Sequence, residues 1–345
     1  GKTSIADHRR PMLSRRQMLR QILETSLSLP LGSMLAGALL QGQNPAAPAN
    51  PSAPVNNSPI TTLSAEDDQF LNDVESASFQ FFWEQGSPNT GMVKDRCNLR
   101  NPNQISAASI AATGFGLTAL CIGDQRKFIP SAAALERVFA TLRFLWRKLP
   151  NHRGFFFHFA HPETGERMYD SEVSSVDTAI LLCGVISCRE HFRHRAVAEL
   201  ANLILNRVDW SWLAEDTSLL THGWTPEVGF LSSRWDYYSE LMMMYLLAMG
   251  AAQRPLPADI WNAWKRLTFE YDGMRYIGSF APLFVHQYSQ AWFDFRNKRD
   301  KYADYFQNSV TATEVHRRFC LELRQQFPDY SEELWGITAS DSQRG

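Results

Sequence analysis

The sequence has few cysteines, almost no excess charge and no common nucleotide-binding motif. Its cysteines show no metal-ligand spacing, so we predict no zinc site, no other metal and no essential disulfide. A net charge of −2 over 345 residues gives no reason to expect nucleic acid or an anionic membrane surface as a partner. The chain also lacks a G-x-x-x-x-G-K-[ST] loop and a nucleophile elbow with serine, histidine and aspartate partners. These absences argue against a P-loop nucleotidase and an α/β-hydrolase, and we predict no cofactor.

The first 63 residues have the composition of targeting and linker segments. Arg15 and Arg16 precede a modestly apolar stretch followed by small residues, which is typical of a twin-arginine export signal over residues 1–45. The alternative is a basic amphipathic helix. Residues 46–63 are rich in Pro, Asn and Ala and predict a disordered linker. We expect one folded domain at residues 64–345, opening with a helix capped near Ser64, a periplasmic or secreted location, and no stable membrane span in the mature protein.

Two kinds of helix alternate along the folded part. Residues 106–122, 174–188 and 239–249 are apolar on nearly every side, whereas residues 132–149, 195–208 and 257–267 are amphipathic. Helices of the first kind must be buried all round, and helices of the second kind cover the outside of a core. Such alternation predicts an all-α fold, a barrel of inner and outer helices. The segments "RGFFFHFAH" and "MRYIGS" predict short β-hairpin strands in the connections.

Charged residues gather just before the predicted inner helices. Asp95 and Arg96 precede the first, Glu172 precedes the second, and "SSRWDYYSE" with Arg234, Asp236 and Glu240 introduces the third. If the inner helices run parallel, all three segments converge on one mouth of the barrel. Charges at a pocket floor are costly unless they serve binding or catalysis.

Glu172 and Glu240 are the candidate catalytic pair. Glycosidic hydrolysis needs one carboxylic acid to protonate the leaving oxygen and a second carboxylate to activate water or attack the anomeric carbon. Asp236 and Glu240 are spaced i, i+4, so both could lie on one helical face. The alternatives are that Glu240 caps its helix and that Asp177 bonds a neighbouring helix end, rather than binding a ligand.

Aromatic residues accompany these acids. Trp224, Trp235, and Tyr288 and Trp292 of "VHQYSQAWFDFR" lie in or beside the same connections, where aromatic faces could stack on pyranose rings. Each tryptophan alone is more often a core residue. His158 and His286 could be hydrogen-bond donors to a ligand or satisfied core histidines, and we favour a donor role only for His286.

Taken in order, seven segments resemble a known family. They are "FQFFWEQGSPNTGMVKDR", "SIAATGFGLTAL", "RGFFFHFAHPETGER", "SEVSSVDTAILL", "GWTPEVGFLSSRWDYYSE", "PLFVHQYSQAWFDFR" and "LWGITASD". The stretch from Asp67 to Asp341 is similar to the bacterial glucoamylase-like domain, the group that includes the endo-β-1,2-glucanases of glycoside hydrolase family 144. The resemblance implies an (α/α)6 barrel, secretion across the inner membrane, and metal-independent, internal cleavage of β-1,2-glucan.

The resemblance also implies roles for individual residues. It assigns Glu240 as the proton donor and Glu172 as the base or nucleophile, although the order could be reversed. Substrate contacts are expected from Asp95, Arg96, Asp177, Trp224, Arg234, Trp235, Asp236, His286, Gln287, Tyr288 and Trp292. The expected partner is an oligo- or polysaccharide. Two other functions remain open, a transglycosylase on the same glycan and a non-catalytic glycan-binding module of the cell envelope.

Overall fold

The computed structural model describes residues 63–98, 100–101, 106–279 and 282–338, which form two compact units. Residues 63–265 and 291–294 make the first unit, and residues 266–290 and 295–338 make the second. The chain therefore passes from one unit to the other three times. The predicted export signal and, apart from position 63, the predicted linker lie outside the described residues.

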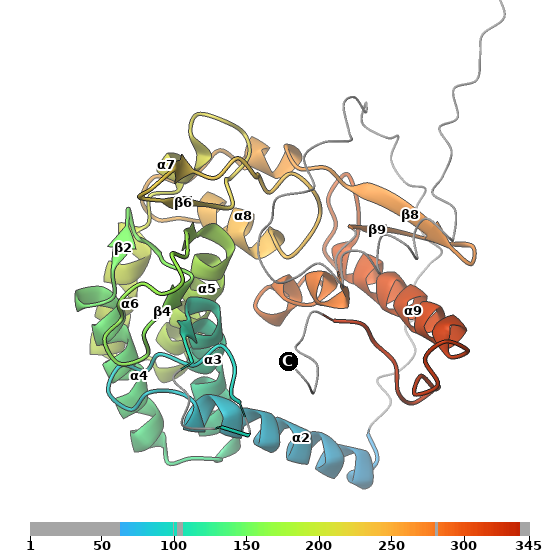
Figure 1. Cartoon of the computed structure of the whole chain (residues 1–345), viewed down its shortest axis with the longest axis horizontal. Coiled ribbons are helices and arrows are strands. Elements are labelled where there is room, and N and C mark those ends of the chain that lie inside the picture. Colours follow the sequence, from blue (N-terminus) through green and yellow to red (C-terminus); the bar gives the residue numbers. More distant parts are fainter. Residues whose placement is uncertain (1–62, 99, 102–105, 280–281, 339–345) are drawn as a thin grey trace, which may run out of the picture. The chain divides into compact units, whose positions relative to one another are not determined.

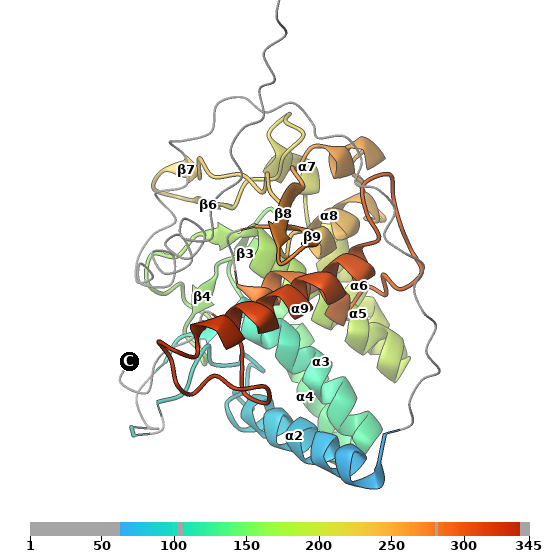
Figure 2. The same ribbon diagram turned by 90° about the vertical axis from the view of Figure 1, so that its right-hand side faces the viewer.

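The first unit is mainly helical (Figure 1). Its helices are α2 (Ala65–Glu84), α3 (Ile110–Arg126), α4 (Ser131–Arg147), α5 (Ser175–Phe192), α6 (Arg195–Arg207), α7 (Trp210–Ala214), α8 (Met242–Met249) and the 3-10 helix η1 (Ala258–Asn262). α3 packs along α5, and α5 also contacts α8, whereas the amphipathic helices α4 and α6 contact each other and cover this inner layer (Figure 2). Within this unit the predicted alternation of inner and outer helices is confirmed from α3 to α6.

Glycines let the two longest inner helices approach closely. A Cβ atom on Gly114 of α3 would lie 2.5 Å from the carbonyl oxygen of Ile180 in α5. A Cβ atom on Gly184 of α5 would meet the carbonyl oxygen of Gly114. The backbones thus touch where the helices cross, which a side chain on either residue would prevent.

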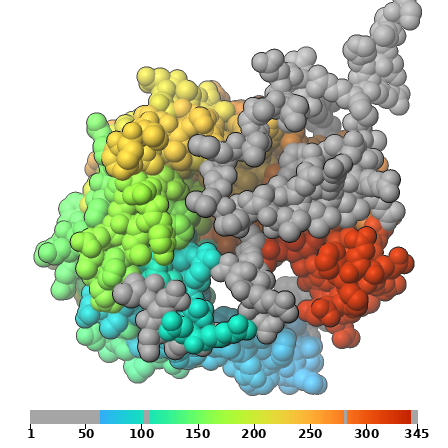
Figure 3. Space-filling model, in the orientation of Figure 1, coloured from blue at the N-terminus to red at the C-terminus, as the bar shows by residue number. Residues whose placement is uncertain are grey.

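Short strands form the connections at one end of these helices. They are β1 (Ala108–Ser109), β2 (Asn151–His152), β3 (Phe155–Phe156), β4 (Phe159–Ala160), β5 (Val173–Ser174), β6 (Gly223–Thr225) and β7 (Gly229–Phe230). β1 pairs with β4, β2 with β3, and β5–β6–β7 make an antiparallel sheet of three strands. The outer helices and these connections form one continuous green and yellow surface in Figure 3. The strands expected in "RGFFFHFAH" are confirmed as β3 and β4.

The second unit combines a hairpin with a long helix. β8 (Leu267–Tyr271) pairs with β9 (Met274–Gly278), and the segment expected as a strand in "MRYIGS" is confirmed. α9 (Tyr305–Leu323) packs against β9 and against the 3-10 helix η2 (Leu283–His286). A further 3-10 turn, η3 (Ser289–Ala291), ends at the start of the 291–294 segment. Tyr271, Val315 and Phe319 form the buried core of this unit.

Two predicted helices differ from the structure. The helix expected at residues 239–249 begins only at Met242, and residues 257–267 form the short η1 and the start of β8 instead of an amphipathic helix. Backbone pairing explains both differences: the Lys265 N–H donates to the Asp236 carbonyl (2.6 Å), and the Tyr238 N–H donates to the Lys265 carbonyl (2.8 Å). These bonds pair Lys265 with residues 236–238 as a β-bridge, which ends the helical pattern after η1 and keeps the chain out of helix just before α8.

The helix before these segments begins as expected. Ser64 caps α2 by accepting a hydrogen bond from the Asp67 N–H at 3.0 Å, and three acidic residues occupy the first turn. Among the described residues, no helix combines the length and the apolar composition needed to cross a bilayer. A mainly helical fold with short strands is confirmed, and the closed (α/α)6 ring stays a prediction.

Candidate active site

The segments before three inner helices meet, as the sequence predicts. The Ile110 N–H at the start of α3 donates to the carbonyl of His158 (3.2 Å), and the His158 N–H donates to the carbonyl of Glu172 (2.9 Å). The Ser175 hydroxyl, in the first turn of α5, accepts a hydrogen bond from the Trp235 indole N–H at 2.8 Å. The N-terminal ends of α3 and α5 and the segment leading to α8 therefore lie side by side.

An arginine holds the segment that carries Glu172. Tyr169 and Asp170 adopt left-handed backbone conformations, with φ of 58° and 48°, which non-glycine residues rarely adopt. The Arg167 guanidinium donates to the carbonyls of Asp170 and Ser171, both at 2.7 Å. It also forms an ion pair with Glu227 at 2.6 Å. These bonds offset the backbone strain and fix the path of the chain into Glu172.

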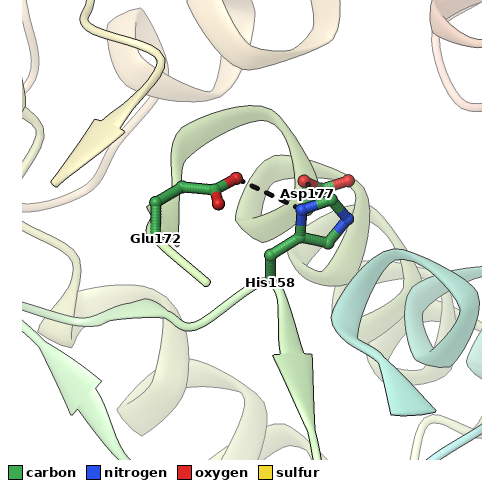
Figure 4. Close-up of side chains that lie close together, drawn as sticks. All are labelled: His158, Glu172 and Asp177. Atoms are coloured by element: carbon green, nitrogen blue, oxygen red, sulfur yellow. Dashed lines mark hydrogen bonds and ion pairs between the residues drawn. The ribbon is translucent and has the colours of Figure 1, made fainter. Parts of the chain in front are cut away.

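His158 lies between two carboxylates (Figure 4). Its Nδ1 is 3.2 Å from Oε1 of Glu172, and its Nε2 is 3.6 Å from Oδ2 of Asp177. Asp177 is in the first turn of α5, whereas Glu172 immediately precedes β5. The histidine thus connects two acids that reach it from different elements.

The charges of this cluster support one another. Burial lowers the pKa of His158, but the Asp177 charge and the hydrogen bond with Glu172 raise it by more, to about 9. Burial raises the pKa of Glu172, and the hydrogen bond and charge of His158 outweigh that effect, so its pKa lies below the ordinary value. Near neutral pH the histidine is a cation and Glu172 is an ionised carboxylate.

The same three side chains could hold a metal ion. Each offers one ligand atom, and these atoms lie within 4.8 Å of one another. Each ring nitrogen of His158, however, faces a different carboxylate, Nδ1 at hydrogen-bond distance and Nε2 at ion-pair distance, which suits a positively charged imidazolium. We therefore assign the positive charge of the cluster to the histidine.

The environment of Glu240 raises its pKa, whereas that of Glu172 lowers the pKa of that residue. Glu240 is half-buried, and burial followed by the charge of Asp177 raises its pKa to about 7. It lies directly before Leu241, the N-cap residue of α8. Asp236 and Glu240 do not share a helical face, because the chain becomes helical only at Met242.

Asp177 serves its own helix and the histidine together. The Ser174 hydroxyl caps α5 and donates to the Asp177 carboxylate at 2.5 Å. The Asp177 backbone N–H donates back to the Ser174 hydroxyl at 3.3 Å. The expected helix-end bond therefore exists, on α5 itself, and the carboxylate also faces His158.

The other predicted residues of the first unit surround this cluster with varied partners. Asp95 forms an ion pair with Arg96 (2.8 Å), and its charge contributes to raising the pKa of His158. Arg234 forms an ion pair with Glu215. Asp236 lies 3.5 Å from the Lys265 ammonium, and burial, only partly offset by that lysine, raises its pKa.

The predicted aromatic residues of the first unit are stacked on neighbouring rings. Trp235 stacks on His222 with ring centroids 4.1 Å apart, and Trp224 stacks on His152 at the same distance. Trp292 donates from its indole nitrogen to the Thr118 hydroxyl at 3.1 Å, so it packs on α3. Its contacts are with the helix body rather than with the acids.

Three predicted residues belong to the second unit. His286 is buried in η2, and burial followed by the charge of His316 lowers its pKa to about 4, so it is neutral. Tyr288 packs on Phe284 with ring centroids 4.9 Å apart, and Gln287 is exposed. An open groove of about 550 Å³ in this unit is lined by residues from the C-terminal end of α9, such as Leu323, and contains none of the predicted residues.

Sequence reasoning undervalued two histidines. His158, which we did not favour as a ligand donor, is the residue that joins the acids, and His222 stacks on Trp235 beside Ser175. A polar side chain inside the aromatic run "FFFHFAH" was the available signal. Its partners are 14 and 19 positions away, so the pairing itself could not be inferred from local pattern.

Known proteins similar to this chain belong to the group that the sequence resembles. The Glycoamylase family model, described as "Putative glucoamylase", matches residues 232–345. An exo β-1,2-glucooligosaccharide sophorohydrolase (non-reducing end) from Parabacteroides distasonis is 27% identical over 320 residues. That match covers 81% of this chain but 44% of the relative, so this chain spans less than half of the relative's length.

Two solved structures are also similar. An endo-β-1,2-glucanase from Chitinophaga pinensis, in complex with sophorotriose and glucose, is 26% identical with a TM-score of 0.74, covering 82% of this chain and 73% of that one. A β-1,2-glucanase from Parabacteroides distasonis is 25% identical with a TM-score of 0.73, covering 80% of this chain and 44% of that one. The resemblance to the glucoamylase-like group that includes β-1,2-glucanases is thereby confirmed.

Proposed function

We propose that this chain is an exported glycoside hydrolase that cleaves β-1,2-glucan internally, with Glu240 as the acid and Glu172 as the base or nucleophile. The observation that carries the proposal is the opposite environment of the two carboxyl groups within one unit. Burial keeps Glu240 protonated up to a pKa of about 7, whereas His158 keeps Glu172 ionised. Two titratable groups with pKa values pushed apart are what acid and base roles require.

The chemistry follows from those two states. The Glu240 proton is donated to the glycosidic oxygen as the bond to the anomeric carbon breaks. The Glu172 carboxylate either removes a proton from the attacking water or attacks the anomeric carbon itself. A carboxyl separation of about 5–5.5 Å in the substrate complex would indicate retention, and about 6.5–9.5 Å would indicate inversion.

The substrate class is supported by the relatives, whose names specify β-1,2-linked glucan or glucooligosaccharide. Stacked tryptophans near the acids suit the apolar faces of pyranose rings. We also propose the (α/α)6 barrel as the complete fold, in line with the inner and outer helices of the first unit. Export rests on the twin-arginine pattern at Arg15 and Arg16.

The test is incubation of the purified chain with linear β-1,2-glucan and separation of the products. We expect a series of short oligosaccharides from the wild type and none from Glu172→Gln or Glu240→Gln. Glu199→Gln, which removes an exposed charge paired with Arg195 on α6, is the matched control and should stay active.

Other outcomes would overturn parts of the proposal. Release of sophorose alone would contradict internal cleavage, and products longer than the substrate would favour a transglycosylase. Binding of the glycan without turnover would favour a binding module.

A further inference from the structure

We propose that His158 is a positioning residue of this site, whose ring bridges Glu172 and Asp177, holds Glu172 charged and keeps both carboxylates in place. The inference rests on the proposed hydrolase function and adds to it a residue that contacts the base rather than the sugar. Figure 4 shows the ring between the two acids, with its Nδ1 toward Glu172.

The backbone and the ring plane of His158 are both fixed. Its N–H and carbonyl are bonded to Glu172 and to Ile110 at the start of α3, at 2.9 and 3.2 Å. Its ring stacks on Phe159 with centroids 3.9 Å apart and planes 13° from parallel. A ring held at three points has little freedom to turn away, so Nδ1 keeps its hydrogen bond with Glu172 and Nε2 stays at ion-pair distance from Asp177.

The charges around the ring require a cation. Glu172 and Asp177 face it directly, and Asp95, from the segment before α3, adds a third negative charge that Arg96 partly compensates. Other ionisable groups near Glu172 are His222, whose pKa is lowered by burial, and the Arg167 guanidinium, which is paired with Glu227. Without the imidazolium, the partly buried Glu172 would regain its proton at a higher pH, since burial alone favours the neutral carboxyl.

Asp177 links His158 to the proposed acid, Glu240. The negative charge of Asp177, whose Oδ2 lies 3.6 Å from Nε2 of His158, contributes to raising the pKa of Glu240. One histidine thus contacts the base and also the carboxylate that influences the acid. The expected signature of its loss is a change in pH dependence rather than a loss of sugar affinity.

The first experiment compares pH profiles of kcat/KM for the wild type, His158→Gln and His158→Lys. In His158→Gln we expect the acidic limb to move up by about one pH unit, a tenfold loss at the low-pH end, with kcat falling more than KM rises. His158→Lys, which restores a positive charge, should recover part of the acidic limb. An unchanged acidic limb in a folded His158→Gln protein would overturn the proposal.

A matched control is available at the other end of α5. His191 also contacts a carboxylate, Asp124, at 2.7 Å, but it lies at the C-terminal end of the helix. His191→Gln removes a histidine–carboxylate pair of the same kind and should leave the pH profile unchanged. A shift in both variants of similar size would attribute the effect to stability and overturn the positioning role.

The second experiment measures the charge of the His158 ring directly and is read together with the activity of the same chain. The histidine rings of the full chain are titrated by NMR, which reports the charge of each ring. His158→Gln serves only to assign the His158 signal, and His158→Lys replaces it if His158→Gln fails to fold. We expect His158 to be protonated at pH 7.5, whereas a neutral ring in an active enzyme overturns only the positioning role. A protonated ring in a chain that cleaves no β-1,2-glucan overturns the proposed function, and the positioning role with it.

Discussion

At the residue scale, two glutamates of one unit differ in charge because their neighbours differ. Glu172 has an imidazolium 3.2 Å away, whereas Glu240 is half-buried and is affected by the negative charge of Asp177. Sequence reasoning could name both acids, because a glutamate before an apolar helix is a local pattern. It could not assign their charges, which depend on a histidine 14 positions from one acid and 82 from the other.

The pH dependence of hydrolysis follows from these pKa shifts. Glu240 must be protonated, so kcat/KM should fall as the pH rises through about 7. Glu172 must be ionised, and because its pKa is lowered, the acidic limb should lie below the ordinary glutamate value of 4.5. Initial rates on β-1,2-glucan across a buffer series measure both limbs. Glu240→Asp is the control for the alkaline limb. If the midpoint of that limb is the same in this variant as in the wild type, the limb belongs to another group.

Glu240→Gln should remove hydrolysis, by about a thousandfold or more in kcat, while lowering the free energy of unfolding at pH 6 by no more than about 1 kcal/mol. The sign of any pH effect is fixed by the raised pKa. A carboxyl with a folded pKa of about 7 favours the folded state fully below its unfolded pKa, and this contribution is lost as the pH rises through 7. Relative to wild type, the variant should therefore gain stability between pH 5 and 8. Chemical denaturation at both pH values measures it, and a large loss at pH 6 would point to a structural role.

At the element scale, the crossing of α3 and α5 sets the inner layer. The sequence correctly indicated these helices, because they are apolar all round, and Gly114 of "TGFGLTAL" lets them pack closely. It failed at residues 257–267, where Ile260, Trp261 and Trp264 are spaced as on a helix. There the backbone of Lys265 pairs with the Asp236–Tyr238 segment, a partner far away in the chain.

Gly114→Ala tests the crossing. The added methyl would lie 2.5 Å from the Ile180 carbonyl, so the helices must separate, and we expect a loss of about 2–3 kcal/mol in the free energy of unfolding. Gly250→Ala, at the end of α8, is the control, because its new methyl has one neighbour, at 3.1 Å. Thermal and denaturant melts compare the two variants, and an equal loss in both would refute close packing as the reason for Gly114.

At the scale of the whole molecule, the predicted export signal lies outside the described residues and is tested in cells. Arg15→Lys together with Arg16→Lys should keep the protein in the cytoplasm, because the twin-arginine pair is read by a receptor and lysine does not replace it. Fractionation with an antibody against the folded part measures the distribution. The matched control is Arg9→Lys with Arg10→Lys, a basic pair outside the motif. Export that continues without Arg15 and Arg16 would contradict the proposal.

The three passages of the chain between the two units have a consequence for how the protein can be divided. Residues 291–294 belong to the first unit, yet both neighbouring segments belong to the second. Neither unit is therefore a continuous piece of chain, and no single cut, by a protease or in a gene, releases one of them intact. Recombination at a single position cannot exchange one unit and keep the other intact. We therefore expect genes descended from this one to carry both units together.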